Sequence, residues 1–239
     1  MTELIYQTDS AVRSFEATVT ASDAEASAVA LDRSAFYPGG GGQPCDLGWL
    51  TWAGDKVAVT KAKRSGGQVL HWLDGTLPEV GAVVKGELDW ERRYALMRTH
   101  TALHILCGVV WRDYGAQVTG GNMEPLKGRM DFEFEHLQKE LVAEIEAAVN
   151  AQVAAARDIR VAILPREEAF AIPDLIRTKI NLLPEGIREV RTVEIVGLDL
   201  QADGGTHVAN TGEVGHVSVV GYKSKGRINK RIRIALDQE

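Results

Sequence analysis

The sequence is poor in cysteine and contains no long hydrophobic run. Only Cys45 and Cys107 occur among the 239 residues, which gives no support for a disulfide framework; we expect two buried free thiols in a reducing compartment. No stretch approaches 18 uncharged apolar residues, so no membrane-spanning helix is predicted. The opening residues MTELIYQTDS lack the basic start and apolar middle of a signal peptide. We therefore expect a cytoplasmic protein that does not engage a membrane.

Acidic residues outnumber basic ones, and the net charge of −6 would argue against a nucleic-acid partner if it were spread evenly. It is not, because the stretch YKSKGRINKRIRIA at 222–235 contains no acidic residue. Most charged runs form solvated surfaces, but such a patch can also bind phosphate groups. Its basic residues are Lys223, Lys225, Arg227, Lys230, Arg231 and Arg233.

The first third of the chain has the pattern of a small β-barrel. Short apolar strands alternate with turn-forming clusters that are rich in glycine, proline and aspartate. The expected strands include 15–22, 56–63 and 82–90, and the turn clusters include 37–44, 65–68 and 73–78.

From Trp90 the apolar spacing changes to three and four residues, which predicts a buried helix to about Tyr114, ended by the turn-like segment 115–122. A strand is expected at 128–134 and a long helix within 135–157. Apolar residues follow one stripe of that helix: Leu137, Leu141, Ile145, Val149 and Val153.

Further strands are expected after a proline-bounded middle segment and a glycine-containing loop. They lie at 159–165, 188–197, 216–223 and 226–236. Helices and strands are segregated rather than alternating, which predicts an α+β fold. The chain is expected to form a β-barrel domain at 1–90 and a two-layer α+β domain at 91–239, with an antiparallel sheet and long helices.

The stretch HTALH places His100 and His104 four residues apart, on one face of the expected helix, where two imidazoles can converge on one ion. Without a further ligand, such a pair is more often part of the core or the surface than a metal site. A metalloprotease is excluded because Thr101 occupies the position of the general-base glutamate. Cys107 is too far along the helix to join both histidines and is expected to pack in the core.

Further ligands are found downstream in LDLQADGGTHVANTGEVGHV. His207 and Asp203 flank Gly204 and Gly205, whose freedom to adopt positive φ would let both side chains bend toward one point. Three imidazoles and one carboxylate, from His100, His104, His207 and Asp203, suit a single zinc ion per chain.

These motifs together resemble the AlaX family, the free-standing relatives of the alanyl-tRNA synthetase editing domain. The resemblance rests on the early FYPGGGGQP, on HTALH and on GGTHVANTGE, which follow one another in this order along the chain, and it covers nearly the whole chain. The length fits the medium class of that family. The family usually has cysteine four residues before the last histidine, where this chain has Asp203. Because oxygen is a harder donor than sulfur, we expect weaker zinc retention, or an Asp203 that orients a ligand without binding the ion.

The resemblance implies hydrolysis of alanine tRNA charged with serine or, second, glycine, with the ion positioning the substrate and activating water. Two alternatives are a tRNA-binding module with weak catalysis, and the editing of serine on threonine tRNA. A monomer or weak homodimer is expected. The candidate catalytic residues are His100, His104, His207, Gln43 and Thr206, and the candidate substrate contacts are Ser34, Gly40, Gly41, Gly42, Gln43 and Asn210.

The tRNA is expected to be held by basic residues that contact its phosphates: Arg92, Arg93, Lys223, Lys225, Arg227, Lys230 and Arg231. Tyr37, Trp49 and Trp52 could stack on its single-stranded end, although core packing is the commoner role for aromatic residues.

Several polar residues have competing interpretations. Thr206, Asn210, Thr211 and Glu213 could simply stiffen their loop through hydrogen bonds, or they could contact the terminal adenosine of the tRNA or a catalytic water. Asn122 and Glu124, expected in the turn after the helix, are weaker candidates for such contacts. Three other histidines, His71, His136 and His216, are expected to be structural or on the surface.

Overall fold

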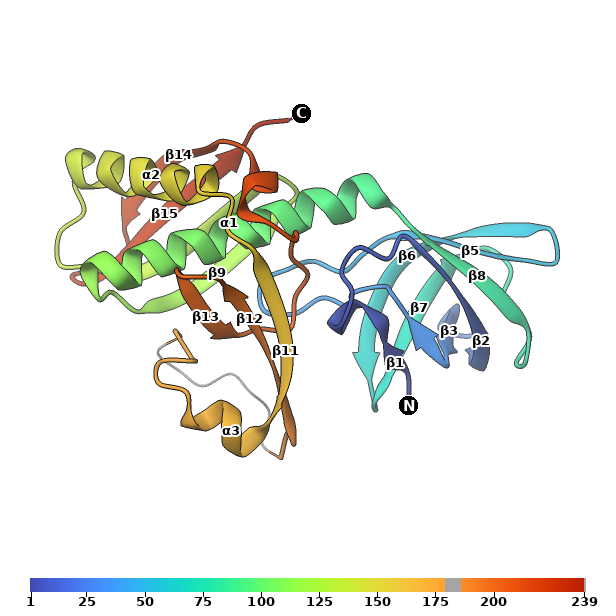
Figure 1. The fold of residues 1–239 in the computed structure, drawn as a ribbon. Coiled ribbons are helices and arrows are strands. Elements are labelled where there is room, and N and C mark those ends of the chain that lie inside the picture. The colour runs from blue at the N-terminus through green and yellow to red at the C-terminus, as the bar shows by residue number, and fades with distance from the viewer. Residues whose placement is uncertain (179–185, 239) are drawn as a thin grey trace. The chain divides into compact units, whose positions relative to one another are not determined.

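The structure is a computed structural model that describes residues 1–178 and 186–238 (Figure 1). It divides into two compact units, Met1–Ala95 and Leu96–Glu239. Part of the proline-bounded middle segment, 179–185, lies outside the described residues. The expected α+β class with an N-terminal β-barrel is confirmed. Within the described part of the chain, no helix combines the length and apolar character needed to cross a bilayer.

The first unit contains a closed barrel of six antiparallel strands in the order β2-β3-β7-β6-β5-β8. The strands are β2 (Ser14–Asp23), β3 (Ala28–Leu31), β5 (Gly48–Trp52), β6 (Asp55–Ser65), β7 (Gln68–Asp74) and β8 (Val83–Leu88). A short parallel pair, β1 (Glu3–Leu4) with β4 (Arg33–Ser34), and the 3-10 helix η1 (Ile5–Gln7) complete the unit.

Alternating side chains fill the barrel interior. In β2, Phe15, Ala17 and Val19 are buried and belong to one apolar core with residues of the other strands. Position 86 in the facing strand β8 requires glycine, because a Cβ there would lie 2.5 Å from the Phe15 ring. The alternation that predicted the strands is therefore the pattern that separates the inside of the barrel from its outside.

Helix α1 (Trp90–Tyr114) begins in the first unit and continues in the second, with the predicted bounds. Residues 96–110 are all buried, so the helix is enclosed on every side. Two sheets approach it closely at glycines. A Cβ at Gly128 of β10 would lie 2.9 Å from Leu103, and a Cβ at Gly108 would lie 2.9 Å from Asp199 of β13. Polar groups on such a helix must find partners inside the protein.

One of these sheets has four antiparallel strands in the order β14-β15-β10-β9. They are β9 (Val118–Glu124), β10 (Lys127–Glu133), β14 (Val217–Ser224) and β15 (Asn229–Leu236). Helix α2 (Lys139–Ala154) lies against β14 (Figure 1), and the Asn150 amide both donates to and accepts from the backbone of Val217.

Two local predictions in this region are wrong. The segment that was expected to be a turn after α1 forms β9, so Asn122 and Glu124 lie in a strand. The apolar stripe of α2 is also shifted. Because the helix begins at Lys139, Leu137 precedes it and Leu141 is only half-buried, whereas the buried positions are Val142, Ile145, Val149 and Val153.

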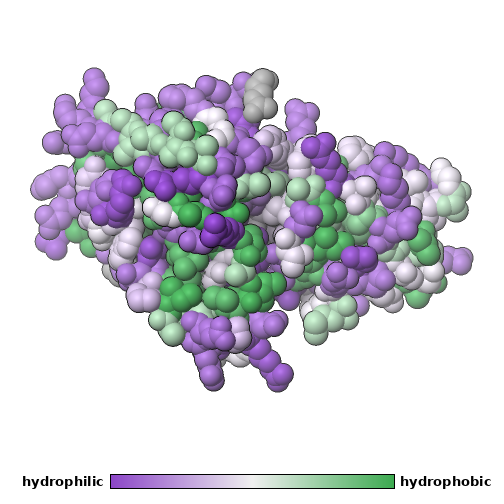
Figure 2. Space-filling view, viewed as in Figure 1, coloured by the Kyte–Doolittle hydropathy of each residue, from purple (hydrophilic) through white to green (hydrophobic). Residues whose placement is uncertain are grey.

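The other sheet is antiparallel, in the order β11-β12-β13, with β11 (Ile159–Pro165), β12 (Glu189–Ile195) and β13 (Asp199–Ala202). The short helix α3 (Arg166–Ala171) packs on it through Ala169, beside Leu175 and Val190. Figure 2 shows hydrophobic surface over this sheet, and its strand β11 includes the exposed Val161 and Ile163. The 3-10 helix η2 (Thr211–Val214) follows in the loop between β13 and β14.

Candidate metal centre

Two buried histidines project from the enclosed helix α1. His100 and His104 are 5% and 6% exposed, and their ring centroids lie 4.9 Å apart, as the i,i+4 spacing predicted. The helix supplies no carboxylate beside them, so their partners come from another segment.

That segment is the loop after β13, which contributes Asp203 and His207. The Asp203 amide donates to the Arg191 carbonyl at 3.1 Å, which continues the pairing with β12. The Gly205 amide then donates to Asp203 Oδ2 at 2.7 Å and turns the chain. The expectation that Gly204 and Gly205 use positive φ is wrong, because neither adopts it. A side chain accepting a backbone hydrogen bond bends this loop instead.

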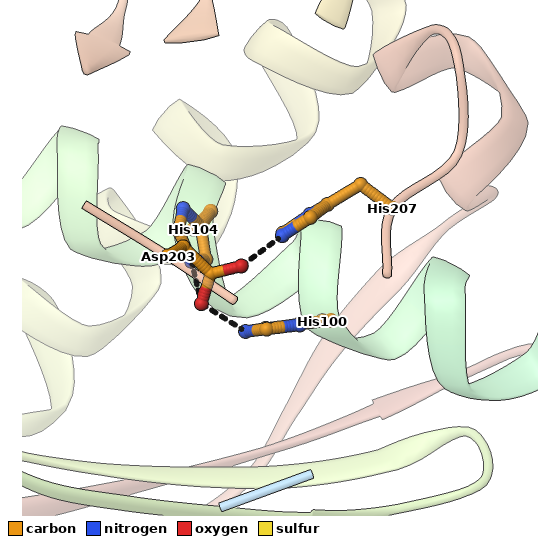
Figure 3. Close-up of side chains that lie close together, drawn as sticks. All are labelled: His100, His104, Asp203 and His207. Carbon is orange, nitrogen blue, oxygen red and sulfur yellow. Dashed lines mark hydrogen bonds and ion pairs between the residues drawn. The ribbon is translucent and has the colours of Figure 1, made fainter. Parts of the chain in front are cut away.

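The four side chains point toward one another (Figure 3). Asp203 Oδ2 lies 3.0 Å from His207 Nε2, and Asp203 Oδ1 lies 3.5 Å from His100 Nε2 and 3.9 Å from His104 Nε2. One ligand atom from each residue lies within 4.8 Å of the others. The predicted convergence is confirmed. Three nitrogens and one carboxylate oxygen form a donor set that fits zinc.

Burial and mutual interaction set the charge of this group. Burial lowers the pKa of His207 to about 4, although Asp203 opposes the shift, and burial likewise lowers the pKa of His100 well below 6.5. Burial alone would raise the pKa of Asp203, but His100, His207 and His104 together hold it well below 3.8. At neutral pH His100 and His207 are therefore neutral beside an ionised carboxylate, as ligands of a divalent cation must be.

Two further residues contact the candidate ligands, and the sequence did not single them out for this role. The Thr101 hydroxyl lies 3.1 Å from His207 Nδ1. Arg191 Nη1 donates to the Asp203 carbonyl at 2.9 Å and lies 3.6 Å from Asp203 Oδ2. Thr101 could have been found from its place between the two histidines of HTALH, but Arg191 is identified only by the pairing of β12 with the loop.

The polar residues after His207 form hydrogen bonds with nearby backbone groups, which agrees with the interpretation that they stiffen their loop. Asn210 and Glu213 form a capping box at the start of η2, and Asn210 also donates to the Ala156 carbonyl at 2.7 Å. Thr211 donates to the Gln152 carbonyl at 2.9 Å. A contact of Asn210 with substrate stays a prediction, as does a catalytic role for Thr206, which is fully buried.

The first unit also contains a buried polar pair. Ser34 Oγ lies 2.8 Å from His71 Nε2 and accepts a hydrogen bond from the Phe36 amide at 3.2 Å, and both partners of the pair are fully buried. Burial lowers the pKa of His71 to about 4. His71 is therefore structural, as expected. The role of Ser34 in contacting substrate stays a prediction, and its contacts with His71 and Phe36 lie within the first unit.

The glycine-rich stretch forms a tight turn in which the Gly40 and Gln43 amides each donate to the other's carbonyl, at 3.0 and 2.9 Å. Gly39, Gly40, Gly41 and Gly42 all have positive φ, so the run of four glycines is a conformational requirement. Gln43 is buried, and Tyr37 packs against Tyr6 and donates to the Gly40 carbonyl. Tyr37 is thus a core residue. The substrate roles of Gly40, Gly41, Gly42 and Gln43 stay predictions.

The residues that were predicted to contact phosphate differ in how exposed their side chains are to solvent. Arg93 is 0% exposed, and its guanidinium donates to the Asp46 carboxylate and to the backbone carbonyls of Ser10 and Ala35. Lys230 is 6% exposed and donates to two carbonyls of its own hairpin. The prediction that these two residues contact phosphate is wrong, because neither charge is accessible.

Other members of the basic set keep their charges near solvent. Lys223, Lys225 and Arg227 are exposed, whereas Arg231 is half-buried and forms an ion pair with Asp131 at 2.7 Å. Arg92 is half-buried and donates to the Cys45 carbonyl at 3.3 Å.

The remaining residues confirm most minor predictions. Cys45 and Cys107 are free thiols; Cys107 is buried as expected, but Cys45 is only half-buried. His136 and His216 are exposed, as expected of surface histidines, and Trp49 is partly exposed on β5.

Two parts of the chain match known protein families. Residues 3–92 match the family described as tRNA synthetases class II (A), and residues 190–233 match the threonyl and alanyl tRNA synthetase second additional domain. The second match covers Arg191, Asp203 and His207. The chain is therefore a member of the class of proteins that share domains with the alanyl- and threonyl-tRNA synthetases.

Relatives that match this chain over nearly their whole length identify its family within that class. The chain is 40% identical over 236 residues to the alanyl-tRNA editing protein AlaX-M of Saccharolobus solfataricus, covering 97% of this chain and 98% of the relative, and 36% identical over 242 residues to AlaX-M of Methanosarcina barkeri, covering 99% of each. It is also 38% identical over 224 residues to the alanine–tRNA ligase of Pyrobaculum aerophilum, covering 91% of this chain but 25% of the ligase. The chain belongs to the AlaX-M family of alanyl-tRNA editing proteins, which confirms the resemblance seen in its motifs.

Proposed function

We propose that this chain hydrolyses the ester that joins a wrongly attached amino acid to alanine tRNA, with serine as the first substrate and glycine as the second. One observation carries the proposal: three imidazoles and a carboxylate converge within 4.8 Å in a chain of the AlaX-M family. An aminoacyl ester is already reactive, so the chain needs mainly to position it beside an activated water.

His100, His104, His207 and Asp203 would hold one zinc ion. A bound zinc ion supplies a positive charge that can polarise a carbonyl or lower the pKa of water. The protein's part is to keep two imidazoles neutral by burial and to hold Asp203 in place through Arg191 and the Gly205 amide. Gln43 and Thr206 are proposed to assist the reaction.

Selection of serine over alanine depends on hydrogen bonding. A hydrophobic pocket gains only about 1–3 kcal/mol per methylene, too little to separate amino acids that differ by one small group. A site whose polar groups bond the serine hydroxyl would leave those groups unpaired with alanine, which discriminates better. Correctly charged alanyl-tRNA is therefore expected to be spared.

The tRNA is proposed to lie with its phosphates against the exposed residues Lys223, Lys225 and Arg227 of the β14–β15 hairpin. Such contacts orient the substrate without specifying its sequence.

The experiment that tests the proposal follows release of labelled amino acid from alanine tRNA charged with serine, glycine or alanine, and from threonine tRNA charged with serine. We expect release from the first two, loss of activity with a chelator, and recovery with zinc. His104→Ala should lower the rate at least about a hundredfold, whereas the exposed His136→Ala should not. Tight tRNA binding without release would favour a binding module, and release only from threonine tRNA would overturn the substrate assignment.

A glycine pair tests the part of the proposal that involves the glycine-rich turn. Gly41 and Gly66 have φ of 58° and 56°, and no atom lies within 4 Å of a Cβ built at either. Alanine should therefore cost both positions the same backbone strain, about 1–2 kcal/mol. If the turn approaches substrate, Gly41→Ala will lower kcat/KM for seryl-tRNA and Gly66→Ala will not. Equal activity of the two variants would remove the turn from the site.

A further inference from the structure

The hydroxyl of Thr101 touches the side of His207 that faces away from the other ligands. Thr101 Oγ1 lies 3.1 Å from His207 Nδ1, while His207 Nε2 lies 3.0 Å from Asp203 Oδ2. Thr101 is fully buried and His207 is 4% exposed, so water cannot readily replace either contact. Both nitrogens of the ring are thus engaged, one by a carboxylate and the other by a hydroxyl.

These contacts constrain where the ring carries its proton. A neutral imidazole has one N–H donor and one acceptor nitrogen, and an ionised carboxylate can only accept. A hydrogen bond from Nε2 to Asp203 therefore puts the proton on Nε2 and makes Nδ1 the acceptor of the Thr101 hydroxyl. A cation bound by Nε2 needs the lone pair of that nitrogen, which puts the proton on Nδ1.

A threonine hydroxyl suits both cases because it can donate one hydrogen bond and accept others by rotating its hydrogen. A backbone carbonyl at the same place would fix one tautomer, and an apolar side chain would leave a buried N–H unpaired.

We propose that Thr101 is a positioning residue for the metal centre, whose hydroxyl reverses its hydrogen bond so that His207 can change tautomer when a divalent cation binds. The inference depends on the metal site of the proposed function but not on ester hydrolysis. Because Thr101 lies on α1 between His100 and His104, one helix provides two ligands and orients the third.

The first test is the affinity of the full-length protein for Zn²⁺, measured by competition with a chromophoric chelator. Thr101→Val keeps the shape and removes the hydroxyl, and it should weaken zinc binding about 10- to 100-fold, the usual effect of losing a partner of a ligand histidine. Thr101→Ser keeps the hydroxyl and should restore the affinity.

Thr99→Val is the matched control. Thr99 is a buried threonine of the same helix, and its hydroxyl accepts from the Leu126 amide at 2.9 Å. Its replacement should lower stability and leave zinc affinity unchanged, which separates general damage to α1 from loss of the contact with His207.

The second test needs no variant. Nitrogen-15 NMR of labelled histidine in the wild-type protein should show the His207 proton on Nε2 without metal and on Nδ1 with zinc. The proposal is overturned if the protein binds no divalent cation, if the tautomer is the same in both states, or if Thr101→Val binds zinc as tightly as wild type. The NMR result decides the question even if Thr101→Val fails to fold.

Discussion

Removal of the Arg93 guanidinium should destabilise the barrel strongly without weakening tRNA binding. Arg93 and Asp46 are 0% and 1% exposed in their side chains, and Arg93 Nε lies 3.0 and 2.9 Å from the two carboxylate oxygens. In Arg93→Met the Asp46 charge would stay buried, with the Tyr37 amide as a remaining donor at 2.6 Å. Loss of one partner from a buried ion pair typically costs about 3–5 kcal/mol, a large part of the stability of an average domain.

Denaturant unfolding followed by tryptophan fluorescence measures this cost. The matched double variant, Arg93→Met with Asp46→Asn, removes both charges and keeps an acceptor for the Tyr37 amide. It should be less destabilised than the sum of the single variants by at least about 2 kcal/mol. Binding of tRNA, measured where the variants are folded, should equal that of wild type. A stable Arg93→Met protein that has lost tRNA affinity would refute the reasoning and return Arg93 to the phosphate-binding set.

Three further predictions concern pH, the ligand set and the basic hairpin. The pKa of His71 is about 4 in the folded chain against an ordinary 6.5, so the unfolded chain takes up its proton first as the pH falls. The free energy of unfolding that depends on a neutral His71 is therefore fully present above pH 6.5 and decreases by about 3 kcal/mol as the pH falls to 4. In urea unfolding, the difference in stability between wild type and His71→Gln should change across this pH range. A pH-independent difference would contradict the low pKa. Asp203→Cys should raise zinc affinity about tenfold and Asp203→Ala should lower it, in chelator competition; an unchanged Ala variant would show that Asp203 does not bind the ion. Replacing Lys225 with Gln should reduce the slope of log Kd for tRNA against log salt by about 1, whereas Arg231→Gln, whose charge is already paired with Asp131, should not.

The convergence of the four candidate ligands could be predicted because they come from two short segments of the sequence. HTALH gives two imidazoles on one helical face, and the spacing of Asp203 and His207 gives two more ligands on one loop. The sequence did not predict how the loop between Asp203 and His207 turns. Glycine freedom was the expected cause, but Asp203 bends the chain by accepting the Gly205 amide.

The charged residues show why other predictions were wrong. Arg93 lies in a run of charged residues that is typical of a surface, yet its partner Asp46 lies 47 positions earlier. Lys230 belongs to a basic run, but the hairpin closes over its amine. Burial of a charge depends on a partner that is distant in sequence or on the shape of a turn, and neither leaves a periodic signal.

The strand that was expected to be a turn, β9, has a similar explanation. The sequence of β9, VTGGNME, has glycines and few apolar residues, so it has the composition of a turn. Pairing along β10 makes it a strand, in a register that places Gly121 opposite Met130. Pairing with a neighbour decides the structure of such segments more than their own propensity does.

The enclosed helix and the late loop lie far apart in the chain, since Thr101 and His207 are separated by 106 positions. A cation held by both would act as a cross-link across that span, and the chain-entropy treatment of such links gives roughly 4–5 kcal/mol for a loop of about 100 residues. During synthesis of the chain, the two histidines of α1 are made before Asp203 and His207, so the full set of four residues is present only after the later loop has been made. Capture of a cation by all four residues would therefore be a late event in folding, because it requires α1 and the loop after β13 to have come together.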